Sequence, residues 1–328
     1  MTEGARSPFA FVLLMAVAMS AVARPANAEG GYILPDGRVR IVGYNDMDEM
    51  LTAILRPLEH ATGTRFALDL RSTRAAPGAL IDGTSLLAPM GVEMEPDDRV
   101  AVRAAWGGDP IEFRIAHDSL DRAALSSPTG ILVAATNPLR TIDIRRARRV
   151  FVRSSGSEPI TRWGELGATG AWAERPIHPV GMASDTAIGR FVLRHSFAAS
   201  DYVANYAPKR QSRDVVAGVA ADADAIGLAN LNHANGAVRA LAITDNGGVV
   251  RQPTRQVVAS GRYPLDRYLL VYARTDREGH IDPLAGQVLR AMLSAPGQAA
   301  IARGSRGYIP LASAERHVEL IKLENALK

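Results

Sequence analysis

Two short hydroxyl-rich segments are the parts of this sequence best suited to chemistry. Ser184-Asp185-Thr186 stands directly before a helical apolar pattern over 187–197, and Ser72-Thr73 precedes another helical segment in the same way. The first backbone N–H groups of a helix lack intrahelical partners and the helix dipole favours negative charge there, so hydroxyls at these positions can help to hold an anion. The same residues are also ordinary N-caps. Spacing alone leaves both interpretations open.

Motifs for catalysis or metal binding are missing from the sequence. It has no Gly-x-Ser-x-Gly elbow, no Gly-x-x-x-x-Gly-Lys loop and no His-Glu-x-x-His helix. The seven histidines are scattered singly, so no local spacing favours a metal site. Chemistry through Ser184 beside Asp185 would need a general base that the sequence does not nominate. We therefore expect a protein that is not an enzyme, with no catalytic residues, no metal site and no cofactor.

An arginine cluster between residues 140 and 153 raises the question of nucleic-acid binding. Its members are Arg140, Arg145, Arg146, Arg148, Arg149 and Arg153. Only 5% of the residues are aromatic, and apolar residues at helix-core spacing interrupt the cluster. We expect a solvated helix face and no nucleic-acid partner. The alternative is a basic patch that docks on an acidic or membrane partner.

Composition points to a globular chain. With 328 residues and 47% hydrophobic residues, the chain is long enough for about two domains of roughly 150 residues. It contains no cysteine, which excludes disulfides, thiolate metal sites, cysteine nucleophiles and a lipid-modified cysteine. Only three of the 38 basic residues are lysines, so the basic balance comes from arginine.

The N-terminal residues read as a secretory signal. Arg6 precedes an apolar run over 7–22 with its centre at 9–19, and Ala26-Asn27-Ala28 has the small-x-small pattern of a cleavage site. We expect residues 1–28 to be a signal peptide; the alternative is an uncleaved anchor. The predicted location is periplasmic, by secretion and without a lipid anchor.

Alternating strand and helix patterns predict an α/β protein. Strands are expected over 38–43, 65–70 and 85–90, with helices over 47–62 and around 77–82 between them. A second set of strands is expected over 131–136, 178–182, 225–229, 238–244 and 268–272. In a doubly wound α/β domain, ligands bind at loops beyond the carboxyl ends of the strands. The first set places those loops at 43–46, 71–74 and 90–93.

Several short segments, in order along the chain, resemble the phosphate-binding-protein family of ABC-transporter solute receptors. They are Val42-Gly-Tyr-Asn-Asp-Met47, Asp82-Gly-Thr-Ser-Leu-Leu-Ala-Pro-Met90, Ile115-Ala-His-Asp-Ser119, Asn137-Pro138, Ile160-Thr-Arg-Trp-Gly-Glu-Leu166, Ala225-Ile-Gly227, Tyr263-Pro-Leu265 and Leu293-Ser-Ala-Pro-Gly-Gln298 with Gly307-Tyr-Ile-Pro-Leu311. The resemblance implies a type II periplasmic-binding-protein fold, with two doubly wound α/β lobes joined by two hinge strands. We expect lobe one at 29–115 plus 270–328 and lobe two at 116–269, with hinges near 114–118 and 263–270.

The resemblance also implies a ligand site on loops that depart from the family pattern. The family holds phosphate by hydroxyls and helix N-terminal amides, an arginine and an acidic group. Here the first loop is Gly43-Tyr44-Asn45-Asp46, the second keeps Thr73 beside Arg74, the third is Met90-Gly91-Val92, and Val180 stands where the arginine usually lies. Unmatched carboxylates in a closed site would disfavour a dianion. The candidate ligand contacts are Tyr44, Asn45, Thr73, Arg74, Ser184, Asp185 and Thr186.

We expect an exported, monomeric solute-binding protein that takes a small anion or polar solute between its lobes, with phosphate itself doubtful. An ABC-transporter permease or another envelope protein is the expected partner. The alternative is an envelope interaction or sensor module that kept the fold and lost the phosphate site.

Overall fold

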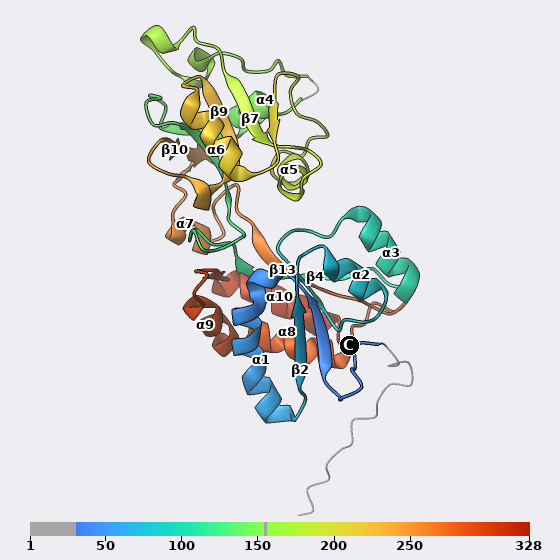
Figure 1. Cartoon of the computed structure of the whole chain (residues 1–328). Helices are drawn as coiled ribbons and strands as arrows, with labels where there is room; N and C mark the ends of the chain where they lie inside the picture. Colours follow the sequence, from blue (N-terminus) through green and yellow to red (C-terminus); the bar gives the residue numbers. More distant parts are fainter. Residues whose placement is uncertain (1–30, 154–155) are drawn as a thin grey trace, which may run out of the picture. The chain divides into compact units, whose positions relative to one another are not determined.

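The computed structural model describes residues 31–153 and 156–328 (Figure 1). The predicted signal peptide, 1–28, lies outside the described residues. Residues 31–328 form one compact unit. No helix in the described ranges is long and apolar enough to cross a membrane.

The N-terminal part of the chain forms a parallel β–α–β unit. Strands β1 (Val39–Gly43) and β2 (Phe66–Leu70) pair in parallel. Between them run the short helix η1 (Asn45–Met47) and α1 (Asp48–Thr62). Helix α1 buries one apolar face and ends at Gly63, whose positive φ of 73° provides a left-handed C-cap. The sequence prediction for 38–70 is confirmed.

A four-stranded sheet with the order β14-β4-β13-β3 lies beside this unit. Its strands are β3 (Ala88–Met90), β4 (Ile111–His117), β13 (Tyr268–Ala273) and β14 (Ile309–Pro310). Strand β13 pairs antiparallel with both β3 and β4, so a segment near residue 270 lies against segments near 90 and 115. The helices are α2 (Ala75–Ile81), α3 (Pro96–Trp106), α8 (Pro283–Leu293), α9 (Ala295–Arg303) and α10 (Ser313–Asn325). Helix α1 contacts α8 and α9, and α10 contacts α8.

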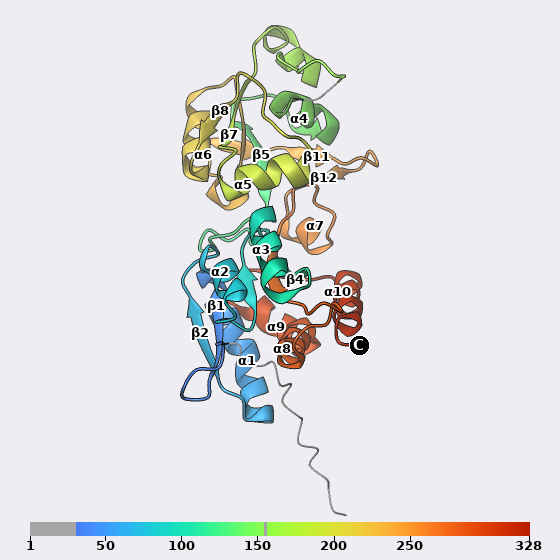
Figure 2. The ribbon, with the colours of Figure 1, turned by 90° about the vertical axis from the view of Figure 1, so that its right-hand side faces the viewer.

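The middle of the chain builds a second sheet with the order β10-β5-β9-β7-β8. Its strands are β5 (Thr129–Ala134), β7 (His178–Met182), β8 (Ala207–Lys209), β9 (Ala225–Asn230) and β10 (Val238–Ala240). A smaller sheet contains β6 (Thr141–Asp143), β11 (Ala242–Thr244) and β12 (Val250–Arg251). The helices of this part are α4 (Ile144–Phe151), α5 (Ala187–Phe191), α6 (Ser212–Ala221) and α7 (Arg255–Ala259), and short turns η2 (Trp163–Leu166), η3 (Gly170–Trp172) and η5 (Leu231–His233) link the strands. Helix α6 contacts β7 and β8, and α5 contacts β7 (Figure 2). The π-helical turn η4 (Val192–Ser196) continues α5.

One predicted strand was wrong in its extent. The segment 238–244 is not continuous, because β10 pairs with β5 whereas β11 pairs with β6 and β12. Leu241 between them donates its N–H to the carbonyl of Ile131, and its side chain is fully buried. The chain therefore changes sheets at Leu241, which a run of apolar residues does not reveal.

Two large hydrophobic cores follow this division of the sheets. One draws on residues between 131 and 265 together with Ile309, and the other on residues 32–124 and 269–326. A smaller cluster, around Leu80, Val102 and Tyr272, lies under α2 and α3. The main chain passes between the two large cores over 124–131 and 265–269. The predicted lobe limits, 29–115 plus 270–328 and 116–269, and the hinges stay predictions.

Candidate functional site

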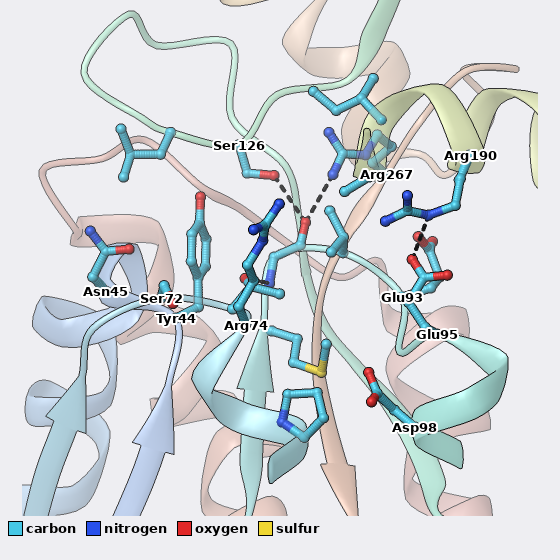
Figure 3. A pocket seen from close by; sticks show the side chains of 18 of the residues that line it. Tyr44, Asn45, Ser72, Arg74, Glu93, Glu95, Asp98, Ser126, Arg190 and Arg267 are labelled. Carbon is cyan, nitrogen blue, oxygen red and sulfur yellow. Dashed lines mark hydrogen bonds and ion pairs between the residues drawn. The ribbon is translucent and has the colours of Figure 1, made fainter. Parts of the chain in front are cut away.

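Loops that follow β1, β2 and β3 surround a pocket of about 420 Å³ (Figure 3). Residues of α5 and Arg267, which directly precedes β13, also line it. Its walls combine apolar side chains with three arginines and three carboxylates. The apolar or small lining residues are Pro77, Met90, Gly91, Val92, Leu125, Ala187 and Ile188. The polar ones are Tyr44, Asn45, Ser72, Thr73, Arg74, Glu93, Glu95, Asp98, Ser126, Arg190, Asn230 and Arg267. Pockets of this size that combine apolar walls with placed polar groups are typical of small-molecule sites.

Tyr44 forms one wall of the pocket by packing on Gly91. Its backbone N–H donates to the carbonyl of Pro89 at 2.9 Å, which ties the loop after β1 to β3. A Cβ added at Gly91 would lie 2.6 Å from Cε1 of the Tyr44 ring, so the ring occupies the space that a side chain at 91 would need. Burial, and then the nearby charges of Asp118 and Asp46, raise the pKa of the Tyr44 phenol. The phenol is therefore neutral and its ring is a fixed aromatic surface.

The backbone N–H and carbonyl of Gly91 form hydrogen bonds with polar side chains that could otherwise contact an anion. Its N–H donates to Thr73 Oγ1 at 3.0 Å, and its carbonyl accepts from Arg267 Nη2 at 2.8 Å and from Ser126 Oγ at 3.4 Å (Figure 3). Thr73 still has its own hydroxyl proton to donate. Arg267, by contrast, points to the protein backbone, because it also donates to the carbonyl of Ser127 at 3.3 Å.

Two of the three pocket arginines are matched by carboxylates. Arg267 Nη1 lies 3.6 Å from Asp118 Oδ2, and both side chains are buried. Burial raises the pKa of Asp118 to about 6 against the opposing charge of Arg267. Arg190 Nε lies 2.7 Å from Glu95 Oε1, and Arg194 approaches the other oxygen of Glu95 at 3.4 Å. Neither pair leaves a free positive charge for a ligand.

The remaining charged groups of the pocket are Arg74, Glu93 and Asp98. Within the described residues, none of the three has an ion pair or a hydrogen bond to another side chain. Figure 3 shows Arg74 beside Tyr44, and Glu93 and Asp98 on the other side of the pocket. The site thus presents one unmatched positive group and two unmatched acidic groups.

Comparison with known proteins shows which proteins the chain resembles. No family model matches it. The phosphate-binding protein PstS of Pseudomonas aeruginosa is 29% identical over 240 residues, which cover 72% of this chain and 71% of that protein. The chain is a homologue of PstS phosphate-binding proteins. This confirms the resemblance seen in the sequence.

Solved structures confirm the fold of this PstS homologue. A phosphate transport receptor from Vibrio cholerae aligns with a TM-score of 0.55 at 15% identity, covering 83% of this chain and 99% of that one. A substrate-binding protein from Clostridium perfringens with bound phosphate aligns with a TM-score of 0.51 at 17% identity, covering 84% and 100%. The α/β, two-lobe binding-protein fold is therefore shown, whereas the ligand of this chain is not.

The pocket of the PstS homologue contains four of the seven predicted contacts. Tyr44, Asn45, Thr73 and Arg74 line it. These four residues lie in the loops after β1 and β2, where the strand pattern placed them. Whether they bind a ligand stays a prediction.

The other three predicted contacts lie outside the lining of this pocket. Thr186 is the N-cap of α5: its Oγ1 accepts from the N–H of Gly189 at 3.1 Å and donates to the carbonyl of Ala183 at 2.6 Å. Asp185 is exposed and pairs with Arg210 at 2.8 Å, which lowers its pKa, and Ser184 is exposed beside it. Of the two interpretations left open by the sequence, capping describes Thr186. The helix instead turns Ala187, Ile188 and Arg190 to the pocket.

Several lining residues were missed by the sequence reasoning, above all Glu93 and Arg267. They belong to segments that are about 175 residues apart and meet because β3 pairs with β13. A signal was present for Arg267, since Asp266-Arg267 interrupts an otherwise apolar stretch between Tyr263 and Ala273. Charged residues inside a buried strand pattern are rarely there without partners.

The arginine cluster and the acidic residues elsewhere have structural partners. Arg146, Arg148 and Arg149 donate to backbone carbonyls of neighbouring loops, and Asp143 caps α4. In the described ranges, one exposed group, Asp276, Glu278 and His280, has ligand atoms within 4.8 Å of one another. Asp276 there accepts from the backbone N–H groups of Glu278 and His280, so it serves a turn.

The contact between Tyr44 and Gly91 predicts strain in Gly91→Ala. We expect this substitution to lower the free energy of unfolding by about 1–3 kcal/mol, because the new methyl group would overlap the ring. In a double-mutant cycle with Tyr44→Ala, the Gly91→Ala cost should largely vanish. Urea unfolding of the wild type, the two single variants and the double variant measures these free energies.

The control for that cycle is Gly78→Ala in the adjacent helix α2. A Cβ at Gly78 meets nothing within 4 Å, so this substitution should be neutral or slightly stabilising. If Gly91→Ala behaves like Gly78→Ala, the ring does not rest on Gly91 in solution.

Proposed function

We propose that the chain is a periplasmic solute-binding protein that holds a small anion or polar solute in the pocket between Tyr44, Arg74 and α5. The observation that carries this proposal is the pocket itself, which has an aromatic wall, an apolar lining and a single arginine without a protein partner among the described residues. An anionic group placed at Arg74 would gain a charge-assisted, bidentate contact. Homology to PstS proteins supports the class of function.

Inorganic phosphate is the disfavoured ligand in this proposal. Within the described residues, Glu93 and Asp98 form no ion pair, and Arg267 and Arg190 are already paired with carboxylates. A compact dianion would therefore meet uncompensated negative charge in a partly enclosed site. Phosphate is also too small to contact the apolar walls of the pocket, such as Met90 and Val92. An organic anion uses both the arginine and these walls.

The proposal predicts a specific loss in Arg74→Gln. Titration calorimetry of the purified protein with ethyl phosphate, phosphate and sulfate should show ethyl phosphate as the tightest of the three, because only its ethyl group can contact the apolar walls. In Arg74→Gln its affinity should fall at least tenfold, because one charge-assisted hydrogen bond contributes about 1.5–3 kcal/mol. Bound ligand should also raise the melting temperature of the wild type.

Arg71→Gln is the matched control for this experiment. Arg71 lies in the same loop and is exposed like Arg74, but it pairs with Asp69 at 2.6 Å and does not line the pocket. Its removal should leave the affinity for ethyl phosphate unchanged. Equal losses in the two variants would mean that the loop contributes only general electrostatic attraction.

Delivery of the solute to an ABC-transporter permease or another envelope protein completes the proposal. The alternative role, an interaction or sensor module without a solute, would be supported if no anion or polar solute in a broad panel changes the melting temperature.

A further inference from the structure

The acidic side of the pocket continues into a second cavity. This cavity has a volume of about 290 Å³ and shares Val92, Glu93, Glu95, Ala187 and Arg190 with the first. Its other lining residues are Met94, Pro96, Arg99, Glu112, Phe191, Arg194, His195 and Tyr272. Glu93 therefore lines both cavities.

No positive group of the described residues pairs with Glu93. Three of the arginines that line these cavities have other partners: Arg267 contacts Asp118 and the Gly91 carbonyl, and Arg190 and Arg194 contact Glu95. On the second cavity's wall, Arg99 donates to the carbonyl of Pro110 at 3.2 Å, and the ring of His195 stacks on Phe191. Glu112 lies nearby as a further acid and accepts the hydroxyl proton of Tyr272.

Burial makes an unpaired carboxylate at this point costly. Desolvation raises the pKa of Glu93 although the charges of Arg267 and His195 oppose it, and Glu112 adds to the rise. Burial, Glu95 and Asp97 likewise raise the pKa of Asp98. A cation bound at this side of the pocket would lower the cost of ionising Glu93 and Asp98, because it stabilises their charged forms. A ligand without a cation leaves that cost in place.

The two sides of the pocket thus have opposite charges without an ion-pair partner. Arg74 lies beside Tyr44, the acids lie opposite, and Val92 and Ile188 line the same space. We propose that the ligand is zwitterionic, with an anionic group at Arg74 and a protonated amine at Glu93. The inference rests on the proposed function and specifies its substrate class.

Matched ligand pairs that differ only in the amine test this inference. Phosphoethanolamine is compared with ethyl phosphate, and 3-aminopropyl phosphate with propyl phosphate, by calorimetry at pH 7. We expect at least one amine to bind tenfold or more tightly than its amine-free partner. In Glu93→Gln that preference should be lost while the affinity for the amine-free ligand is kept or increased. Arg74→Gln should weaken all four ligands.

Asp97→Asn is the control, since Asp97 is an exposed residue in the first turn of α3 and does not line either cavity. It should retain the preference. Equal binding of amine and amine-free ligands would overturn the zwitterion inference and leave the proposed function standing. A preference that survives Glu93→Gln but disappears in Asp98→Asn would overturn the assignment to Glu93. Failure of all four ligands at millimolar concentration would count against both proposals.

Discussion

Replacement of Arg267 by methionine is expected to lower the free energy of unfolding by about 3–5 kcal/mol, because it leaves a buried carboxylate without its cation. Arg267 is only 3% exposed and Asp118 is fully buried, and their charged atoms are 3.6 Å apart. The substitution also removes the donors to the carbonyls of Gly91 and Ser127. Urea unfolding with an unchanged m value would report this loss as a change of stability.

Removing the Asp118 carboxylate as well tests whether its unpaired charge causes the loss of stability in Arg267→Met. Arg267→Met with Asp118→Asn should recover a large part of the stability, since no buried charge remains. The pKa of Asp118 is raised to about 6, above its ordinary value of 3.8, so its protonated form stabilises the fold at low pH and this contribution is lost as the pH rises through about 6. The penalty of Arg267→Met should therefore be larger at pH 8 than at pH 5. A penalty that is independent of pH and of Asp118 would indicate lost packing alone.

Raising the pH from 6.5 to 9 is expected to destabilise the protein through His117. This histidine is fully buried; its Nδ1 is 2.7 Å from Asp266 and its Nε2 is 3.0 Å from Glu315. Burial by itself lowers the pKa of His117, but the hydrogen bonds and charges of Asp266 and Glu315 outweigh it and raise the pKa to about 9. The Tyr268 ring also lies against the imidazole, with 4.8 Å between ring centres.

The raised pKa of His117 determines how the stability changes with pH. Because the pKa in the folded protein lies above the unfolded value near 6.5, the stabilisation is complete below pH 6.5 and is lost as the pH rises through about 9. This difference between the folded and unfolded pKa values corresponds to roughly 3 kcal/mol in the free energy of unfolding. Free energies of unfolding measured at pH 6, 7, 8 and 9 should decline accordingly.

His117→Gln provides the comparison, since glutamine can form hydrogen bonds but cannot become charged. It should be less stable than the wild type at pH 6, and the two proteins should converge towards pH 9. An equally steep decline in His117→Gln would assign the pH dependence to other groups.

His117 and Arg267 lie where the chain leaves β4 and enters β13, the strands that pair at this point. Residues 117, 118, 266 and 267 come from both strand ends, and Glu315 from α10. Sequence reasoning placed hinges at 114–118 and 263–270 from the family resemblance, but it assigned no role to these charges. Their partners are 149 and 198 residues away from His117. No local pattern reports such a pairing.

The elements of the fold were largely predictable because their periodicity is local. The helix at 48–62 and the strands at 39–43 and 66–70 alternate apolar and polar residues with the spacing of their own structure. The helices α3, α6 and α10 were not predicted. Helix α10 leaves Val318 and Ile321 exposed, so its apolar residues do not form one clean stripe.

The sequence by itself determined the α/β pattern, the absence of cysteine and the PstS-like order of motifs. It also placed Tyr44, Asn45, Thr73 and Arg74 in loops that follow strands. The tertiary structure alone decided which groups are free to bind. Whether an arginine can hold an anion depends on which carboxylates and carbonyls surround it, as Arg267 and Arg74 show. Those neighbours are brought together by strand pairing across the chain, because Coulomb and hydrogen-bond energies follow distance in space and not separation in sequence.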